Sequence, residues 1–178
     1  KSCNVDVFFA LSHGVHRGVL KDGKIDDRII FLKKLVEKTP DVKFDLYGID
    51  KVQPIWADHY FKTIANSKMG LNLSRGDAIK YYSSDRITQI VGNGLVCLID
   101  EKTQYNNFFN EKEMVFYKNL SDLSEKIIKL SNDDKFRRKI AHNGKKKYLK
   151  YFNSSLVAQY IIDKSFNLKN RKKNYWEK

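Results

Sequence analysis

Short apolar stretches alternate with longer polar segments along most of the chain. Val7, Phe9 and Leu11 fall at every second position of the stretch 5–11, the spacing of a strand buried in a sheet. The stretch 95–99 is apolar without interruption, which is typical of a strand covered on both faces. The same reasoning predicts further strands over 42–47, 69–73 and 114–117.

Between these strands, apolar residues recur at the spacing of helices. Ile29, Leu32 and Val36 predict a helix that ends before Pro40. Other helices are predicted over 54–66, from Ser83 or Ser84 to Val91, over 105–110, from a cap at Ser121 to Leu130, from Phe136 to Phe152 with a break at Gly144, and over 154–168.

Alternation of strands and helices predicts an α/β fold. The simplest arrangement is a Rossmann-like open, mainly parallel sheet of about five strands with helices on both faces and a C-terminal helical tail. A length of 178 residues suits one core. We expect one domain over 1–168, followed by a basic, frayed end over 169–178. The chain opens with Lys-Ser-Cys-Asn and no signal sequence, so we expect a piece of a longer protein.

Composition excludes several classes of protein. Aromatic residues make up 13% of the chain, too many for a disordered segment. The apolar runs stop well short of the roughly 18 residues that a membrane-spanning helix needs. Cys3 and Cys97 lie in or beside apolar runs and cannot form a disulfide framework, so a reducing, cytoplasmic compartment is the expectation.

The net charge of +13 is unevenly distributed. Residues 133–178 hold 14 Lys or Arg against 4 Asp or Glu, so the rest of the chain is nearly balanced. Three interpretations stay open at this point: the basic segment holds nucleic acid, docks on an absent lobe of the same protein, or contacts an anionic membrane surface.

Candidate ligand-binding residues lie where the predicted strands end. Open α/β sheets bind ligands at the carboxyl ends of their strands, which selects the loops 12–18, 47–50, 74–86 and 100–104. Glycine, hydroxyl and basic side chains beside a helix N-terminus favour a phosphate group. The first loop offers Gly14, Arg17 and Gly18, and the third offers Ser74, Lys80, Ser83, Ser84, Asp85 and Arg86.

Each of these features also has a plainer interpretation. The glycines of the first loop are typical of a turn, and Tyr81 and Tyr82 suit packing better than stacking on bases. Arg86 is placed equally well for a surface ion pair with Asp85 or Asp77. We find no Walker motif, no nucleophile elbow, no paired catalytic carboxylates and no metal-ligand spacing.

The segment from Ser74 to Asp100 resembles the nucleotide-sugar motif of two-lobed, retaining-type glycosyltransferases of the GT-B class, group 1. The stretches 119–123 and 134–144 are similar to the closing pattern of that family. In such enzymes a donor-binding C-terminal lobe faces an N-terminal acceptor lobe. The resemblance therefore implies that this chain is the donor-binding lobe.

Residue by residue, the resemblance implies that the loop from Gly14 to Gly18 faces the diphosphate and that Tyr47 and Gly48 lie near the base. It places Ser83, Ser84 and Arg86 on the phosphates or sugar. Gln89 takes the ribose position, where the family usually has Glu. The candidate donor-binding residues are Gly14, Arg17, Gly18, Tyr47, Gly48, Ser74, Lys80, Ser83, Ser84, Asp85, Arg86 and Gln89.

Breaking the bond from sugar to diphosphate develops negative charge on the leaving group, and fixed donors stabilise it. Arg17 and Arg86 are our candidates for this role, assisted by Lys80 and the helix terminus at Ser83 and Ser84. We expect the acceptor-activating base on the absent lobe, and neither a metal nor a tightly bound cofactor.

The favoured function is thus that of a hexosyltransferase donor lobe. It would bind a nucleotide-diphosphate sugar for transfer to a glycan or lipid-linked acceptor in polysaccharide biosynthesis, in the cytoplasm or at the inner face of the membrane. Its partners would be the nucleotide sugar and the N-terminal lobe. The alternative is a basic α/β module that binds nucleic acid or an anionic surface.

Overall fold

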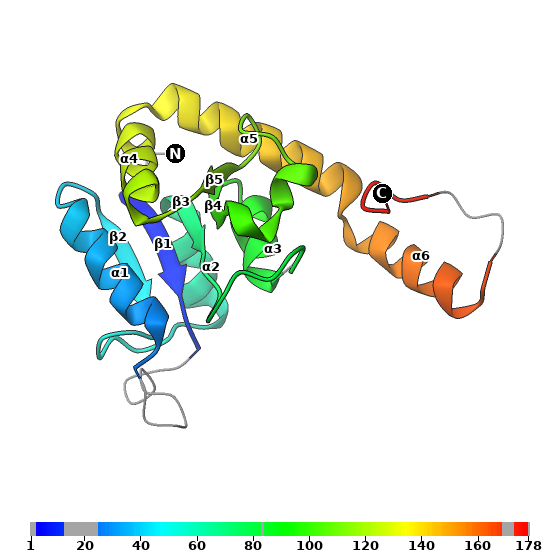
Figure 1. The fold of residues 1–178 in the computed structure, drawn as a ribbon, viewed down its shortest axis with the longest axis horizontal. Helices are drawn as coiled ribbons and strands as arrows, with labels where there is room; N and C mark the ends of the chain where they lie inside the picture. The colour runs from blue at the N-terminus through cyan, green and yellow to red at the C-terminus, as the bar shows by residue number, and fades with distance from the viewer. Residues whose placement is uncertain (1–2, 13–24, 83, 169–172, 178) are drawn as a thin grey trace.

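A computed structural model describes residues 3–12, 25–82, 84–168 and 173–177. Its centre is a five-stranded sheet in the order β2-β1-β3-β4-β5, with every neighbouring pair parallel (Figure 1). The strands are β1 (Val5–Ala10), β2 (Phe44–Tyr47), β3 (Ser67–Asn72), β4 (Val96–Asp100) and β5 (Val115–Tyr117). The predicted Rossmann-like sheet is confirmed.

Helices connect the strands and extend the chain beyond them. They are α1 (Asp27–Lys38), α2 (Ala57–Ala65), α3 (Asp85–Gly92), α4 (Leu120–Asn132), α5 (Asp134–Tyr151) and α6 (Ser154–Ser165), with short 3-10 turns at Glu101–Thr103 and Tyr105–Asn107. The helix predicted over 105–110 is thus only a single 3-10 turn. The cap of α4 is Asn119, whose side chain accepts a hydrogen bond from the Asp122 amide at 3.0 Å, rather than the predicted Ser121.

Two apolar cores lie on the two faces of the sheet. Alternate side chains of β1 separate them: Val7 and Phe9 face the core formed with α1 and α4, whereas Phe8 faces the core formed with α2 and α3. Burial on both faces explains the continuous apolar run of β4. Helix α5 crosses one edge of the sheet, so that Ile140 contributes to the first core and Tyr148 to the second (Figure 1).

The predicted break at Gly144 is wrong, because α5 continues through this residue to Tyr151. Gly144 is buried, and a Cβ atom here would lie 2.2 Å from the carbonyl oxygen of Glu113. Absence of a side chain therefore lets the helix pack directly on the loop before β5. The accompanying ion pair, from Lys147 Nζ to Glu113 Oε2 at 2.8 Å, ties the two segments together.

The last described residues, 173–177, fold back onto the domain, where a frayed end was expected. The hydroxyl of Tyr175 donates to the Phe108 carbonyl at 3.1 Å, and its ring stacks 4.5 Å from that of Tyr151. Trp176 lies 5.6 Å from the ring of Phe152. Among the described helices, none is both long and apolar enough to cross a bilayer.

Candidate functional site

The side of β1 on which new strands are added changes after β2. After β1 the chain builds β2 on one side, then crosses to place β3, β4 and β5 on the other. In parallel α/β sheets, ligands bind in the crevice outside the carboxyl ends of the strands at such a switch point. The residues that follow β1 and β3, and the helix N-terminus beside them, are therefore the first place to look for a site.

A groove of about 350 Å³ opens at this point. Its walls come from the end of β1, the start of α2 and the first turns of α3. The lining residues are Ala10, Leu11, Ser12, Ile55, Trp56, Ala57, Tyr60, Asp85, Arg86 and Gln89. Three of the predicted site residues, Asp85, Arg86 and Gln89, therefore lie together in one groove.

Arg86 is the central cation of the groove. Its guanidinium is half-buried, donates from Nη1 to the Leu73 carbonyl at 3.1 Å, and lies over the ring of Phe9 with Cζ 5.1 Å from the centroid. Over the described ranges, Arg86 forms no ion pair, neither with Asp85 nor with Asp77. Burial is the main cause that lowers the pKa of Arg86 from its usual 12.5, followed by the charge of Arg28.

A second arginine, Arg28, lies close enough for its charge to act on the pKa of Arg86. Arg28 is buried and forms a bidentate pair with Asp26, with Nε to Oδ1 at 2.9 Å and Nη2 to Oδ2 at 2.6 Å. The Asp26 carboxylate is fully buried and faces Arg28. Since this carboxylate is taken up by Arg28, the positive charge of Arg86 is not neutralised from that side. A half-buried cation that forms no ion pair favours an anionic ligand.

The N-terminus of α3 adds to the positive charge of Arg86. Ser84 is the N-cap residue, but its side chain makes no capping bond to the helix. Instead the Ser84 hydroxyl donates to Asn72 Oδ1 at 2.9 Å, which ties the helix start to the end of β3. The positive end of the helix dipole therefore stays open beside Arg86, the arrangement that commonly binds phosphate groups.

The opposite wall of the groove is aromatic. Trp56 is 64% exposed at the rim, a large apolar surface left in water. Tyr60 packs edge-on against Phe8 at 5.4 Å, and its pKa is raised mainly by burial. Ala57 has a φ of 48°, a left-handed conformation that is uncommon for alanine and is often found at functional sites.

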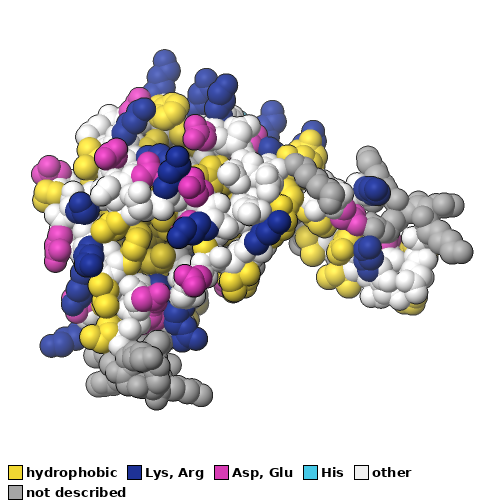
Figure 2. All heavy atoms as spheres, in the orientation of Figure 1, with side chains coloured by type: hydrophobic (Ala, Val, Ile, Leu, Met, Phe, Trp, Pro, Cys, Tyr) yellow, Lys and Arg dark blue, Asp and Glu magenta, His cyan; other side chains and the backbone are white. Residues whose placement is uncertain are grey.

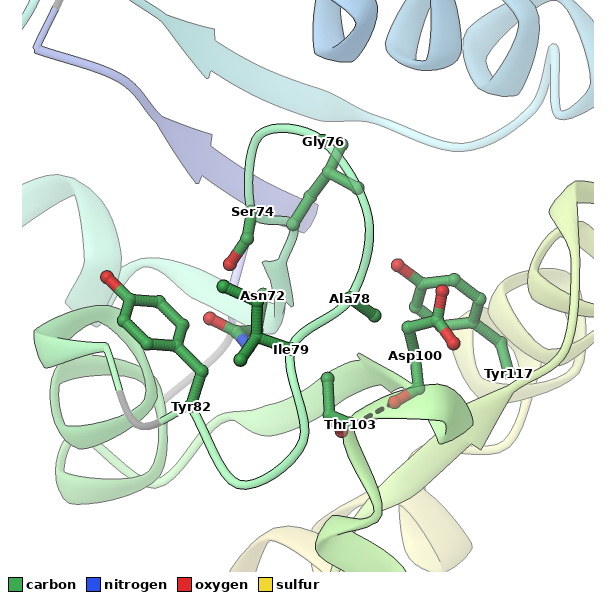
Figure 3. A pocket seen from close by; sticks show the side chains of 10 residues that line it. Asn72, Ser74, Gly76, Ala78, Ile79, Tyr82, Asp100, Thr103 and Tyr117 are labelled. Carbon is green, nitrogen blue, oxygen red and sulfur yellow. Dashed lines mark hydrogen bonds between the residues drawn. The ribbon is translucent and has the colours of Figure 1, made fainter.

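A smaller cavity of about 40 Å³ lies at the ends of β3, β4 and β5 (Figure 3). Ser74 and Tyr82 line it from the loop after β3, opposite Asp100 and Tyr117. The hydroxyl of Tyr117 is buried and has no hydrogen-bond partner in the described structure. Burial is the main cause that raises the pKa of Tyr117, and the charge of Asp100 acts in the same direction.

Other predicted residues lie away from both cavities. Tyr47 packs against Phe8, with ring centroids 6.3 Å apart, and lines neither cavity. Gly48 has a φ of 75° and closely approaches the Leu11 carbonyl, so its role in the described structure is to join the ends of β1 and β2. Lys80 lies over the ring of Tyr81 at 5.0 Å. Gly14, Arg17, Gly18 and Ser83 fall outside the described residues.

Sequence reasoning missed the aromatic wall. Trp56 and Tyr60 were assigned only to a helix, because α2 starts well after the end of β2. Strand ends alone select the loop 47–50, whereas the start of α2 supplies the groove. The available signal was an aromatic pair, Trp56 and Tyr60, at four-residue spacing in a helix whose first turn faces the carboxyl edge.

Within the described ranges, no group of three or more His, Cys, Asp or Glu side chains could hold a metal ion.

Comparison with known proteins places this geometry in a family. The sequence model described as "Glycosyl transferase-like" matches residues 28–163, which is most of the chain. The chain belongs to this glycosyltransferase-like family. With the structural similarity to TarM and HepE, this identifies it as a GT-B glycosyltransferase-like domain.

Solved structures share the fold of this glycosyltransferase-like domain. TarM matches with a TM-score of 0.64 and 14% identity, over 96% of this chain and 36% of TarM. Anabaena Alr3699/HepE, determined in complex with UDP and glucose, matches with a TM-score of 0.63 and 13% identity, over 92% of this chain and 48% of HepE. A variant of S. aureus TarM in complex with Fondaparinux, alpha-GlcNAc-glycerol and UDP gives 0.59 and 12%, over 96% and 36%.

The domain therefore spans between about a third and a half of the proteins that it resembles. None of the curated proteins matches its sequence.

Proposed function

We propose that this domain binds the nucleotide-diphosphate sugar donor of a glycosyltransferase, with the diphosphate at the N-terminus of α3 and Arg86. The observation that carries the proposal is the half-buried Arg86 guanidinium, which lies without an ion pair in the described structure beside an open helix terminus. Both groups line one groove at the switch point of the sheet. A diphosphate would supply the ion-pair partner that Arg86 lacks in the described structure.

The same two groups would stabilise the leaving diphosphate during transfer. As the bond from sugar to phosphate breaks, negative charge develops on the phosphate oxygens, and donors already in place stabilise it without reorganisation. Phe9 and the Leu73 carbonyl hold Arg86 in position. The guanidinium remains protonated at neutral pH, even though burial lowers its pKa, because arginine starts from 12.5.

The nucleoside would lie along the remaining walls. Gln89 follows Arg86 by one helical turn and can donate to or accept from a ribose hydroxyl through its amide. The exposed Trp56 offers a flat apolar surface for a base. The similarity to HepE, whose structure contains UDP, makes UDP the first probe.

Transfer itself would need a second lobe, because the domain spans less than half of the proteins that it resembles. We propose that an N-terminal lobe of the same protein supplies the acceptor site and its base. The reaction would be hexosyl transfer to a glycan or lipid-linked acceptor in polysaccharide synthesis on the cytoplasmic side. The second lobe, the hexosyl group and the class of acceptor are all inferred from the resemblance to two-lobed glycosyltransferases.

Calorimetric titration of the 178-residue chain with UDP, GDP, ADP and CMP tests the proposal. We expect micromolar to millimolar affinity for one of the diphosphates. In Arg86→Ala the affinity falls at least about tenfold, since a charge-assisted bond to phosphate is lost. Arg86→Lys retains the charge but not the two-pronged geometry, so its affinity lies between the two.

Arg138→Ala is the matched control, because it removes an exposed arginine from α5 and leaves the groove intact. Thermal melts monitored by circular dichroism show that each variant is folded. The proposal is wrong if no nucleotide binds to the folded chain, or if Arg86→Ala binds as tightly as Arg138→Ala.

A further inference from the structure

Helix α5 presents a continuous line of positive charge to solvent. Its buried side consists of residues at helical spacing, among them Ile140, Gly144 and Tyr148, which pack on the domain. The opposite side carries cations at positions 135, 138, 139, 145, 146 and 150, which follow the same period. We call this set the α5 basic face: Lys135, Arg138, Lys139, Lys145, Lys146 and Lys150.

Almost nothing neutralises this face. All six side chains are exposed except Lys145, which is half-buried. Asp134 is the sole acidic residue of α5, and it pairs with Arg137 and Arg138. Figure 2 shows Lys and Arg side chains along the upper edge of the molecule, over the helix labelled α5 in Figure 1. From Lys135 to Lys150 the line extends about 22 Å at 1.5 Å per residue.

A hollow of about 280 Å³ adjoins the basic face at the amino ends of the strands. Arg138, His142 and Lys145 line one side of it, and Ser67, the first residue of β3, lies on the other. Lys68 also lines it but already pairs with Asp6 at 2.7 Å. Arg138 and Lys145 therefore place cationic groups on one side of a space large enough for a phosphate-sized group, next to the row of charges on α5.

We propose that the α5 basic face binds an anionic phospholipid surface, with headgroup phosphates along the helix and in the adjoining hollow. A straight helix with cations on one side matches a flat, negatively charged surface. Each basic residue close to such a surface strengthens the attraction to it. The domain would then lie on the bilayer, not across it.

The side chains of the face favour lipid over nucleic acid. Five of the six cations are lysines, which act as point charges, whereas arginine is preferred for two-pronged recognition of nucleic acid. Two aromatic rings of α5 border the face, Phe136 and Tyr151, but each already lies beneath a lysine, Lys129 at 5.7 Å and Lys150 at 4.9 Å, so neither offers an open ring for stacking on bases. Leu149 lies on the same face, 50% exposed, and can enter the boundary between headgroups and acyl chains.

This orientation leaves the nucleotide groove accessible. The hollow lies at the amino ends of the strands, whereas the groove lies at their carboxyl ends. In Figure 1 the strand arrows point away from α5. Lipid binding and nucleotide binding are thus separable, and each can be measured in variants that lack the other.

Co-sedimentation of the 178-residue chain with vesicles tests the proposal. We expect binding to phosphatidylcholine vesicles that contain about 30% phosphatidylglycerol and none to pure phosphatidylcholine. In the triple variant Lys135→Glu, Lys139→Glu and Lys146→Glu, the partition coefficient falls at least about 100-fold, because three surface cations are reversed. The matched control is Lys34→Glu, Lys38→Glu and Lys118→Glu, which has the same net charge and retains most of the binding.

Two further measurements keep the test decisive. Nucleotide titration and the melting temperature test whether the triple variant is folded. If it is not, a variant with Gln in place of Lys135, Lys139 and Lys146 replaces it in the vesicle assay. Inorganic phosphate at constant ionic strength should leave vesicle binding unchanged. The proposal is overturned if neutral vesicles bind equally, if the two triple variants behave alike, if inorganic phosphate displaces the vesicles, or if duplex DNA binds more tightly than anionic vesicles.

Discussion

At the carboxyl edge of the sheet, the groove depends on Arg86, a half-buried guanidinium held by Phe9 and the Leu73 carbonyl. At the amino edge, the six cations of the α5 basic face stand largely in water. The first region has few charges that are poorly hydrated, and the second has many that are well hydrated. Few fixed charges select one ligand geometry, whereas many mobile charges attract any flat anionic surface.

The largest effect is expected from loosening the contact between α5, which carries the basic face, and the rest of the domain. In Gly144→Ala the new Cβ meets the Glu113 carbonyl oxygen at 2.2 Å, a backbone atom that cannot move aside cheaply. We expect a loss of about 3 kcal/mol in the free energy of unfolding, measured by urea titration, since overpacking a buried contact costs that much.

Gly92→Ala is the control for helix propensity. This glycine ends α3, and a Cβ there has open space around it. Replacement should stabilise the domain by about 0.5–1 kcal/mol. Equal effects of the two substitutions would show that α5 does not pack on the loop before β5 as described.

The interior of the sheet, between the two edges, can be tested through Cys97, the second residue of β4. Burial raises the pKa of this thiol to about 12. In the unfolded chain the thiol ionises near pH 8.5, so above that pH the unfolded state binds fewer protons and stability falls as pH rises. We expect a loss of about 2 kcal/mol between pH 8 and pH 10 that is absent in Cys97→Ala.

Thiol labelling gives an independent check on the same strand. Cys3 is half-buried and should react with a thiol reagent in the native protein, whereas Cys97 is 1% exposed and should react only on unfolding. Rapid labelling of Cys97 under native conditions would mean that β4 opens to solvent.

Ionic strength sharpens the contrast between the two edges. Raising NaCl from about 50 to about 300 mM shortens the screening length and should weaken vesicle binding at least about tenfold. Nucleotide affinity should fall less than about threefold, because Arg86 is half-buried and less screened. Equal salt dependence of the two affinities would mean that the charges at the two edges are equally exposed to solvent.

Sequence patterning predicted the sheet well because its signal is local. Every second residue of β1 faces one core, and the unbroken apolar run of β4 reflects burial on both faces. Intrinsic propensity penalises glycine in a helix, so Gly144 predicts a helix break. The structure shows instead that a side chain at this position would meet the Glu113 carbonyl, 31 positions away in the chain. A single sequence gives no sign of that contact.

The position of the candidate site could be predicted from the sequence, but the contacts of its residues could not. The strand ends selected the turn that carries Arg86, since that rule depends only on element order. Its environment was not predictable: the sequence left an ion pair with Asp85 or Asp77 open, whereas the structure places the guanidinium over Phe9. Trp56 joins the groove through the crossover of α2, which depends on tertiary packing.

A smaller effect is expected in the cavity at the ends of β3, β4 and β5. The Tyr117 hydroxyl is buried without a partner in the described structure, whereas the Tyr148 hydroxyl lies 2.8 Å from Thr88 Oγ1. Tyr117→Phe keeps the ring and removes an unsatisfied polar group, so it should stabilise the domain by about 1 kcal/mol. Tyr148→Phe removes a satisfied bond and should destabilise it by about the same amount. Urea unfolding of both variants measures the difference in sign. Destabilisation by Tyr117→Phe equal to that of Tyr148→Phe would show that the hydroxyl bonds to water in the cavity of about 40 Å³, and the carboxyl edge would then hold an ordered polar network beside Asp100.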